Sequence, residues 1–447
     1  MSHYDMMKLL RSTWIDWSKG RNAVYITYNG HRFDEELFRR QFFWNLLPLY
    51  ITNTSGASRL DMLSTLQLVA NFFPHSLKLP VTEEGDISMK LTDWSNANSI
   101  EIENAHDALA DCVQMLELAK IILKEAKPVW QASLKGASKF GNLEILQTEP
   151  FAMIGEVIRR KKFTYPVTFC GQNPKMNNEV AVADLYFDPD QLDELTDAEL
   201  LEQIGNSGTA IRKVRINKSL PVMPSDLIPN IDEYLDIPYE QLVDRARKIQ
   251  NNVRLQTRIS ELLASNQMNY PPPKHLEQSV YSGFPSDADD LWMERFHSLP
   301  WEERSKILDG FEDSRFKELA ERLVCVNNPE SVSNQTFEKY QNFVNQRLYD
   351  KGPWLSLEKT LDKTRSLLLE ASGEKKEILE KLEKNPAKYL PPIKKSILPK
   401  NEIKIDLNKP IKKTLTELDK LKVKTRLLLS GTLIVARDLS LIHISEP

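Results

Sequence analysis

The sequence is poor in cysteine and has no excess of positive charge. Its 447 residues include only 3 cysteines, Cys112, Cys170 and Cys325, which lie far apart and have no metal-ligand spacing. This excludes a disulfide framework and favours a reducing compartment, so we expect a cytoplasmic protein. The net charge of −4 at pH 7 excludes a protein that is basic over its whole surface. Any binding of nucleic acid would therefore require a local groove.

Long hydrophobic runs and internal repeats are also absent. No run of 18 apolar residues occurs, so we expect no membrane span and no membrane partner. The length is sufficient for two or three domains, each with a substantial core.

One acidic residue stands out in a helix predicted from Asn104 to about Ala126. A helical wheel places Asp111 on the apolar side of this helix. Four apolar residues share that side: Ala108, Met115, Leu118 and Ile122. Four polar residues fall on the opposite side: Gln114, Glu117, Lys120 and Lys124. Because an unpaired carboxylate on an apolar face is costly, Asp111 requires either a basic partner or a metal ion.

His106, at the start of the same helix, could transfer a proton near neutral pH. A second acid lies where a predicted buried strand, Asn22–Tyr28, leads into a helix from Asp34 to about Leu47. Asp34 could simply cap that helix. Together, two carboxylates and a histidine are what a Mg²⁺-dependent phosphodiester hydrolase needs, because carboxylate oxygens suit hard cations and histidine can deprotonate water.

Two motifs carry a family resemblance. Tyr28–Glu36 (YNGHRFDEE) and Asn104–Asp111 (NAHDALAD) resemble the second and third motifs of the DEDDh, or DnaQ-like, nucleases, and within them the bacterial exonuclease I family. Val214–Pro221 and Tyr281–Asp289 resemble segments of that family's later domains, so the resemblance covers roughly residues 3–350.

The resemblance implies 3′→5′ hydrolysis of single-stranded DNA to 5′-mononucleotides, in DNA repair and recombination. It assigns Asp34 and Asp111 to the binding of two Mg²⁺ ions, with Mn²⁺ as an alternative, and His106 to the role of general base. It also implies single-stranded-DNA-binding protein as a partner, and a monomer.

One part of the family pattern is missing. Members begin with a strand carrying Asp-x-Glu, but Asp5 and Asp16 have no glutamate two positions on. We therefore expect Met1 to be internal to a longer parent protein and the activity of this chain to be impaired.

Three further residues match substrate contacts of the family. Lys90 stands where an arginine usually reaches the terminal nucleotide, and lysine keeps the charge but loses the bidentate geometry. Arg39 matches a contact to single-stranded DNA, with a surface pair to Glu35 as the alternative. Tyr50 matches an aromatic residue on which a base could stack, with core packing as the alternative.

Lys213, Arg215 and Lys218 could line the groove from the next domain, although a solvated face is the simpler interpretation.

The predicted fold is an incomplete α/β, ribonuclease H-like exonuclease domain (1–130), followed by an SH3-like β-barrel domain with flanking helices (140–268) and a C-terminal α-helical domain (275–370). We predict a linker around 136–142, where small and polar residues gather, and strands over 165–170, 180–187 and 210–216. Helices are expected near 197–205 and 239–265.

The C-terminal part differs in composition. Residues 375–424 hold 15 lysines against 7 acids, and we interpret 371–438 as a solvated, partly disordered tail without family resemblance. The last nine residues, 439–447, resemble an in-frame translation of a sequencing-library adapter, so we expect them to be foreign to the natural protein.

Two other functions stay open. The chain could be a related DEDDh exonuclease that acts on RNA, although the long extension beyond the nuclease domain argues against this. It could also be a catalytically dead fragment that retains only nucleic-acid binding, because two of the four family carboxylates are missing.

Overall fold

The structure is a computed structural model, and it describes residues 1–18, 22–101, 108–205, 208–265, 271–384, 402–406 and 426–430. These residues form two compact units. Unit 1 comprises residues 1–13, 40–49 and the part from 272 onward, and unit 2 comprises residues 14–39 and 50–271. In the part of the chain that is described, no helix is long and apolar enough to cross a membrane.

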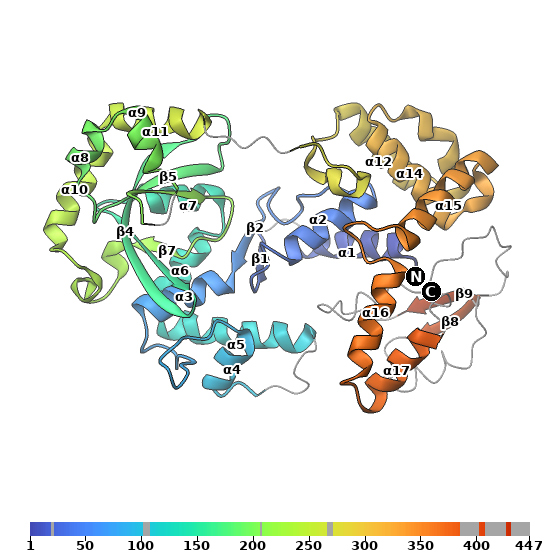
Figure 1. The fold of residues 1–447 in the computed structure, drawn as a ribbon, viewed down its shortest axis with the longest axis horizontal. Coiled ribbons are helices and arrows are strands. Elements are labelled where there is room, and N and C mark those ends of the chain that lie inside the picture. The colour runs from blue at the N-terminus through green and yellow to red at the C-terminus, as the bar shows by residue number, and fades with distance from the viewer. Residues whose placement is uncertain are drawn as a thin grey trace. The chain divides into compact units, whose positions relative to one another are not determined.

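Unit 2 begins with a parallel strand pair (Figure 1). Strand β1 (Val24–Thr27) pairs with β2 (Ser58–Asp61), and helix α2 (Asp34–Trp44) lies in the crossover between them. The prediction that the first strand is buried is wrong. Val24 and Ile26 are 36% and 38% exposed, because within the described residues β1 pairs with β2 alone.

Five helices follow β2. They are α3 (Met62–Phe72), α4 (Leu91–Ala97), α5 (Ala108–Glu125), α6 (Lys127–Lys135) and α7 (Lys139–Leu146). The predicted linker around 136–142 is wrong, because α7 begins there with Ser138 as its N-cap. Asn142 is buried in α7 and donates to the carbonyl oxygens of Ile216 and Lys218 (2.9 and 2.8 Å).

Residues 152–224 form one antiparallel sheet, which we call the antiparallel sheet. Its strands are β3 (Ala152–Ile158), β4 (Lys161–Gln172), β5 (Glu179–Asp184), β6 (Ile211–Arg215) and β7 (Val222–Pro224), in the order β6-β5-β4-β3-β7. The three predicted strands correspond to β4, β5 and β6, whereas β3 and β7 were not predicted.

Short helices connect and cover this sheet. They are α8 (Pro189–Glu194), α9 (Asp197–Glu202), α10 (Tyr239–Asn251) and α11 (Val253–Ser265), with 3-10 turns at Ser225–Leu227 and Ile231–Tyr234. The helix predicted over 239–265 is therefore two helices, divided at Asn252.

The helices of the first part and the antiparallel sheet share one hydrophobic core. Leu66 and Phe72 of α3 and Leu118 and Ile122 of α5 belong to the same buried cluster as Met153 of β3. The approach is close at Gly155 of β3, where an added Cβ would lie 2.7 Å from the Phe72 ring. The predicted boundary between two domains at 130–140 thus falls inside one compact unit.

Unit 1 is helical. It contains the first residues of α1 (His3–Ser18), then α12 (Asp287–Ser298), α13 (Trp301–Arg304), α14 (Ser314–Asn327), α15 (Asn334–Tyr349), α16 (Leu357–Leu368) and α17 (Gly373–Lys384), with 3-10 turns at Leu276–Tyr281, Ser305–Gly310 and Pro329–Ser331. Tyr4, Phe43 and Phe296 are part of its core. The Tyr4 hydroxyl donates to Nδ1 of His297 (2.6 Å), which fixes α1 on α12.

Regular structure also occurs within 371–438, where we expect a partly disordered tail. Helix α17 lies there because its glutamate, lysine and leucine residues all favour helix. Strands β8 (Glu402–Asp406) and β9 (Arg426–Ser430) pair in parallel.

Candidate nucleic-acid interface

The two predicted metal ligands lie near the same side chain. Asp34 begins α2, and Asp111 lies in the first turn of α5. Burial raises the pKa of the Cys112 thiol, and the negative charges of Asp111 and Asp34 raise it further. Both carboxylates are therefore close enough to act on one thiol. His106, the predicted general base, lies outside the described residues.

The alternative of a basic partner for Asp111 finds no support: among the described residues, no lysine, arginine or histidine forms an ion pair with it. The helical wheel was wrong about Gln114, which is 1% exposed and accepts a hydrogen bond from Ser95 of α4 (3.0 Å). Helix α4 covers this side of α5, and that contact between distant segments could not be read from α5 alone.

A third acid, Asp61, was missed by the sequence reasoning. It ends β2, caps α3, and accepts hydrogen bonds from the backbone N–H groups of Asn29 (2.6 Å) and Leu63 (3.1 Å). Burial raises the pKa of Asp61 to about 6, against the effect of these hydrogen bonds, and nearby Asp34 raises it further. Its position at the carboxyl end of a strand parallel to β1 was the available signal.

Asp61 fixes the loop that precedes Asp34. Asn29 has a left-handed backbone (φ 58°), and its N–H points to the Asp61 carboxylate. At Gly30 an added Cβ would lie 2.0 Å from Oγ1 of Thr27, so this position requires glycine.

The metal implied by the family resemblance does not fit the described residues as a complete site. Asp34 and Asp111 offer hard carboxylate oxygens of the kind that Mg²⁺ prefers. Within the described ranges, however, no group of three histidine, cysteine or acidic side chains is placed to hold a metal ion. We therefore derive no reaction step through a metal from these residues.

Lys90 lies beside the carboxyl ends of β1 and β2. It is exposed and precedes α4 as its N-cap. The Tyr28 hydroxyl donates to the backbone carbonyl of Met89 (2.6 Å), and Ser88 hydrogen-bonds to Asp93 in the first turn of α4. These contacts hold the segment before Lys90 to the end of β1.

Arg39 and Tyr50, both predicted substrate contacts, touch each other. The Arg39 guanidinium lies 5.1 Å from the centre of the Tyr50 ring, within cation–π range. Arg39 also donates to Glu35 (3.3 Å), so the alternative of a pair with Glu35 is realised together with the stacking.

Glu35 is a buried hub, 6% exposed. Its Oε2 accepts from Arg39, from Arg59 (3.0 Å) and from the Thr52 hydroxyl (3.0 Å). Arg59, which the sequence reasoning missed, also donates to the Asn217 carbonyl (2.9 Å) and so joins β2 to the loop after β6.

Four arginines, among them the two that bind Glu35, lie near Lys218, and we call these five cations the basic cluster: Arg32, Arg39, Arg59, Arg215 and Lys218. Burial lowers the pKa of Lys218, and the positive charges of Arg215, Arg32, Arg39 and Arg59 lower it further. Lys218 and Arg215 therefore face the same region as Arg39. Lys213 instead lies against Gly205, where an added Cβ would be 2.4 Å from its Cε.

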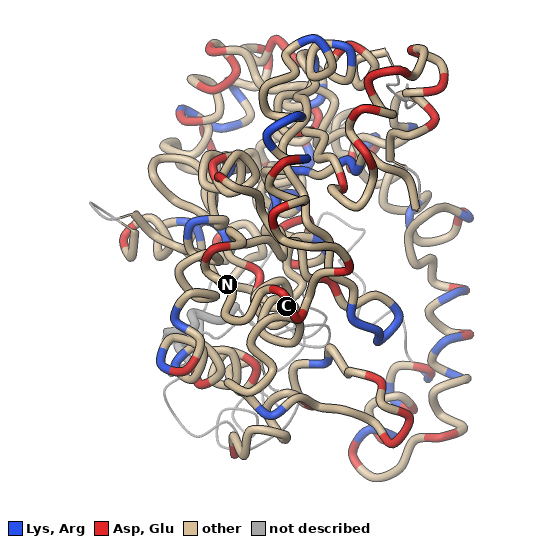
Figure 2. Tube along the Cα trace, turned by 90° about the vertical axis from the view of Figure 1, so that its left-hand side faces the viewer, with Lys and Arg blue, Asp and Glu red and all other residues tan. Residues whose placement is uncertain are grey.

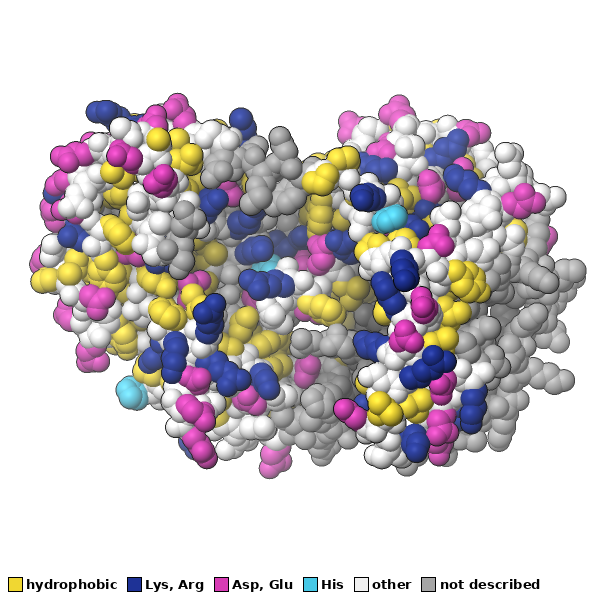
Figure 3. All heavy atoms as spheres, viewed as in Figure 1, with side chains coloured by type: hydrophobic (Ala, Val, Ile, Leu, Met, Phe, Trp, Pro, Cys, Tyr) yellow, Lys and Arg dark blue, Asp and Glu magenta, His cyan; other side chains and the backbone are white. Residues whose placement is uncertain are grey.

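The surface confirms that positive charge is local. Figure 2 shows lysine and arginine interspersed with acids along the described trace. Figure 3 shows basic side chains gathered where β1 and β2 lie in Figure 1.

His31 and Ser219 connect the loop before Asp34 to the antiparallel sheet. The Ser219 N–H donates to Nε2 of His31 (2.9 Å), so this nitrogen carries no proton. The Ser219 hydroxyl accepts from the Asp61 N–H (2.8 Å) and donates to the Arg59 carbonyl (3.1 Å). Burial lowers the pKa of His31 to about 3, with the charges of Arg59, Lys218 and Arg39 acting in the same direction.

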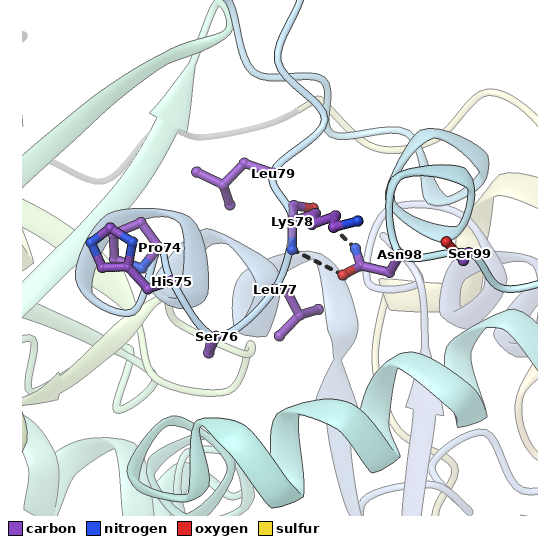
Figure 4. Close-up of a pocket in the computed structure, with 8 residues that line it drawn as sticks. All are labelled: Pro74, His75, Ser76, Leu77, Lys78, Leu79, Asn98 and Ser99. Carbon is purple, nitrogen blue, oxygen red and sulfur yellow. Dashed lines mark hydrogen bonds between the residues drawn. The ribbon is translucent and has the colours of Figure 1, made fainter.

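A pocket of about 530 Å³ lies apart from these residues (Figure 4). Its lining is Pro74, His75, Ser76, Leu77, Lys78, Leu79, Asn98 and Ser99. The Asn98 amide already pairs with the Lys78 backbone, accepting at 2.9 Å and donating at 3.0 Å. None of the predicted site residues lines this pocket.

A parallel strand pair joined by a helix, with an antiparallel sheet and further helices in the same unit, defines an α/β protein whose acids, cations and an aromatic ring lie near that strand pair. Solved structures share the fold. An exonuclease I from Methylocaldum szegediense matches with a TM-score of 0.71 and 23% identity, over 87% of this chain and 84% of that one. Escherichia coli exonuclease I in complex with a dA16 oligonucleotide matches with a TM-score of 0.71 and 20% identity, over 86% and 84%.

Sequence matches show similarity to the same enzyme. Exodeoxyribonuclease I of Haemophilus influenzae is 28% identical over 67% of this chain, and that of Escherichia coli is 25% identical over 59%. The family model described as the exonuclease I C-terminal domain matches residues 274–388. The chain is therefore similar to bacterial exonuclease I, as the sequence motifs predict. It spans 66% and 58% of the lengths of these two relatives.

A different family matches the C-terminal part. The model for the fumarase C-terminus covers residues 376–446, and fumarate hydratase 2 of Leishmania major is 47% identical over 68 residues, or 15% of this chain and 12% of that protein. The expectation that 371–438 resembles no family is therefore wrong. The fumarase range reaches into 439–447, and the adapter origin of those residues stays a prediction.

Proposed function

We propose that the chain carries the single-stranded-DNA site of a 3′→5′ exonuclease of the exonuclease I type, an activity that releases 5′-mononucleotides, and that unit 2 supplies this site. The observation that carries this proposal is the Arg39 guanidinium, held between Glu35 and the Tyr50 ring inside the basic cluster. A cation beside a partly exposed aromatic ring suits a phosphate followed by an unstacked base.

The other site residues have proposed roles on the same side of β1 and β2. Lys90 would hold the terminal nucleotide by its charge, and Asp34 and Asp111 would hold Mg²⁺, or Mn²⁺, with further acids. His106 is the proposed proton acceptor. Because Asp34 and Asp111, even with Asp61 near Asp34, form no complete ligand set among the described residues, we expect residues 1–447 to bind single-stranded DNA but to hydrolyse it negligibly.

The proposal also covers the domains of the chain and its protein partner. We propose that the antiparallel sheet is the SH3-like barrel and that α12–α16 form the helical domain of the family. One structural neighbour is described as an SSB/exonuclease I complex with an inhibitor. Single-stranded-DNA-binding protein is accordingly the proposed partner of this chain, which would act as a cytoplasmic monomer in DNA repair.

The first test compares the binding of three kinds of nucleic acid. Purified residues 1–447 are titrated into labelled single-stranded DNA, duplex DNA and RNA of one sequence, with fluorescence anisotropy as the readout. We expect the tightest binding to single-stranded DNA, and equal or tighter binding to RNA would favour the RNA-acting alternative. No binding to any of the three would refute the proposal.

Hydrolysis is measured separately, with the label at the 3′ or the 5′ end and with Mg²⁺ present. Asp34→Asn/Asp111→Asn is the matched variant, and we expect it to equal the unaltered chain. A rate in the ordinary enzymatic range, about 1–10³ s⁻¹, that His106→Ala abolishes would contradict the expected inactivity.

A further inference from the structure

The hairpin between β3 and β4 ends in an unusual turn. Ile158 pairs with Lys161, so Arg159 and Arg160 alone form the turn. Both have positive φ, 49° and 67°, as a type I′ turn requires. Asn-Gly is the favoured sequence there, and two arginines in left-handed conformations are unfavourable. Such backbone outliers are retained where they serve a function.

The tip of this hairpin concentrates positive charge. Arg159, Arg160, Lys161 and Lys162 are consecutive and all exposed. Lys161 pairs with Asp86 (2.5 Å), and the charge of Arg160 contributes to a lowered pKa of Glu84, after the larger effect of hydrogen bonds from Thr82 and the backbone. Within the described residues, Arg159 and Lys162 have no acidic partner.

An aromatic ring follows directly. Phe163 is 41% exposed, and its ring is nearly parallel to that of Tyr165, with 6.5 Å between centroids and 6° between planes. Tyr165 is held by the Arg212 guanidinium, 3.7 Å from its ring centre. The exposed ring beside free cations is the combination on which single strands stack.

The tip is also joined to the segment that carries Lys90. The backbone N–H of Ile87 donates to the Arg160 carbonyl (2.9 Å), and Asp86 holds Lys161. The tip therefore lies alongside the proposed binding segment rather than on an unrelated surface.

We propose that this hairpin tip is a second contact for single-stranded DNA, in which Arg159 and Lys162 bind backbone phosphates and Phe163 stacks on a base upstream of the 3′ end. The inference rests on the proposed function and adds a contact in the antiparallel sheet that none of the predicted site residues provides. Duplex DNA fits less well, because its bases are already stacked on one another.

The test uses a variant whose turn residues favour the observed backbone conformation, so that loss of binding cannot be caused by a disrupted turn. Arg159→Asn/Arg160→Gly installs the favoured type I′ sequence and removes two charges, so the variant should fold at least as well as the unaltered chain. Arg247→Ala/Arg254→Ala removes two exposed charges from α10 and α11 of the same unit and serves as the control. Anisotropy with an oligothymidylate of ~16 nucleotides is measured over a series of salt concentrations.

We expect the turn variant to reduce the slope of log affinity against log salt by about 0.7, since it removes Arg159, one of the two proposed phosphate contacts, and each such contact on a single strand contributes roughly 0.7. The control should leave the slope unchanged. Phe163→Leu should weaken binding about fivefold or more, as loss of one stacked base does. Thermal unfolding reports whether each variant is folded.

The outcomes separate the two proposals. If the unaltered chain binds the oligonucleotide and the turn and Phe163 variants bind equally well, the hairpin contact is refuted while the proposed function stands. If the unaltered chain does not bind, both fall. A turn variant that is less stable than the unaltered chain would show that the arginines serve the fold, and Lys162→Thr with Phe163→Leu would then decide the binding question.

Discussion

Replacing Glu35 tests whether the basic cluster depends on one buried carboxylate. The side chains of Glu35, Arg59 and Arg39 are 7%, 9% and 17% exposed, so their charges are poorly screened by water. Glu35→Gln keeps an acceptor oxygen but loses the charge, and hydrogen bonds to charged groups contribute about 1.5–3 kcal/mol each. We expect Glu35→Gln to lower the free energy of unfolding by about 2–3 kcal/mol, and Glu35→Ala by about 3–5 kcal/mol, because it removes the carboxylate that pairs with both Arg39 and Arg59.

The assay is urea unfolding together with anisotropy on single-stranded DNA. Glu117→Gln is the control, because it breaks an exposed pair with Lys120 and should cost less than about 1 kcal/mol. Under conditions where Glu35→Gln is folded, it should also bind DNA more weakly, since Arg39 loses one of the two contacts that orient it. Equal unfolding midpoints and equal DNA affinities for Glu35→Gln and Glu117→Gln would refute the view that Glu35 organises the cluster.

Three further predictions concern the same unit. Ser219→Ala should destabilise the chain by about 1–3 kcal/mol, measured by urea unfolding, because it leaves the N–H of Asp61 without its acceptor. His31 has a folded pKa of about 3, below its ordinary 6.5, so the unfolded chain binds more protons between these values. Stability should therefore decrease as the pH is lowered from about 6.5 to about 3, by at most about 1.4 kcal/mol per pH unit. His31→Gln should reduce the dependence of the free energy of unfolding on pH in this window. An unchanged dependence would show that His31 does not cause it. Lys90→Arg should bind single-stranded DNA more tightly than the unaltered chain, and Lys90→Ala more weakly, if Lys90 holds a phosphate or base edge in the way proposed.

Local patterns in the sequence predict where the helices of the site begin and end. They predict less well which other segments pack against those helices. Helix α2 begins at Asp34, as its acidic first turn predicts, and α5 continues to Glu125, close to the predicted end. The i,i+4 pair of Glu35 and Arg39 was also predictable from spacing alone. These features depend on neighbouring residues, whose physical effects the sequence displays directly.

The features that were missed depend on contacts between distant segments. Gln114 is buried because α4 packs on it through Ser95, although its position on the wheel is polar. Residues 139–146 form a helix although their composition suggested a linker, because Ser138 caps it and Asn142 bonds to the loop after β6. Arg59 and Asp61 lie on a four-residue strand too short for a pattern, and their roles arise from Glu35 and Asn29.

The antiparallel sheet completes the candidate site rather than merely adjoining it. Ser219 accepts from Asp61 and donates to Arg59 and His31, so one residue from the loop before β7 fixes both the end of β2 and the loop leading to Asp34. Lys218 enters the basic cluster from the same loop. Because each of these hydrogen bonds joins the sheet to β1 and β2, the orientation of Arg59 and of the Asp34 loop requires the sheet to be docked. The cluster should therefore form or disappear cooperatively with the shared core of unit 2, and hydrogen exchange should show similar protection for the N–H groups of Asp61 and Ser219. Protection of Asp61 that persists when Ser219 exchanges freely would show that β2 holds its conformation without the sheet.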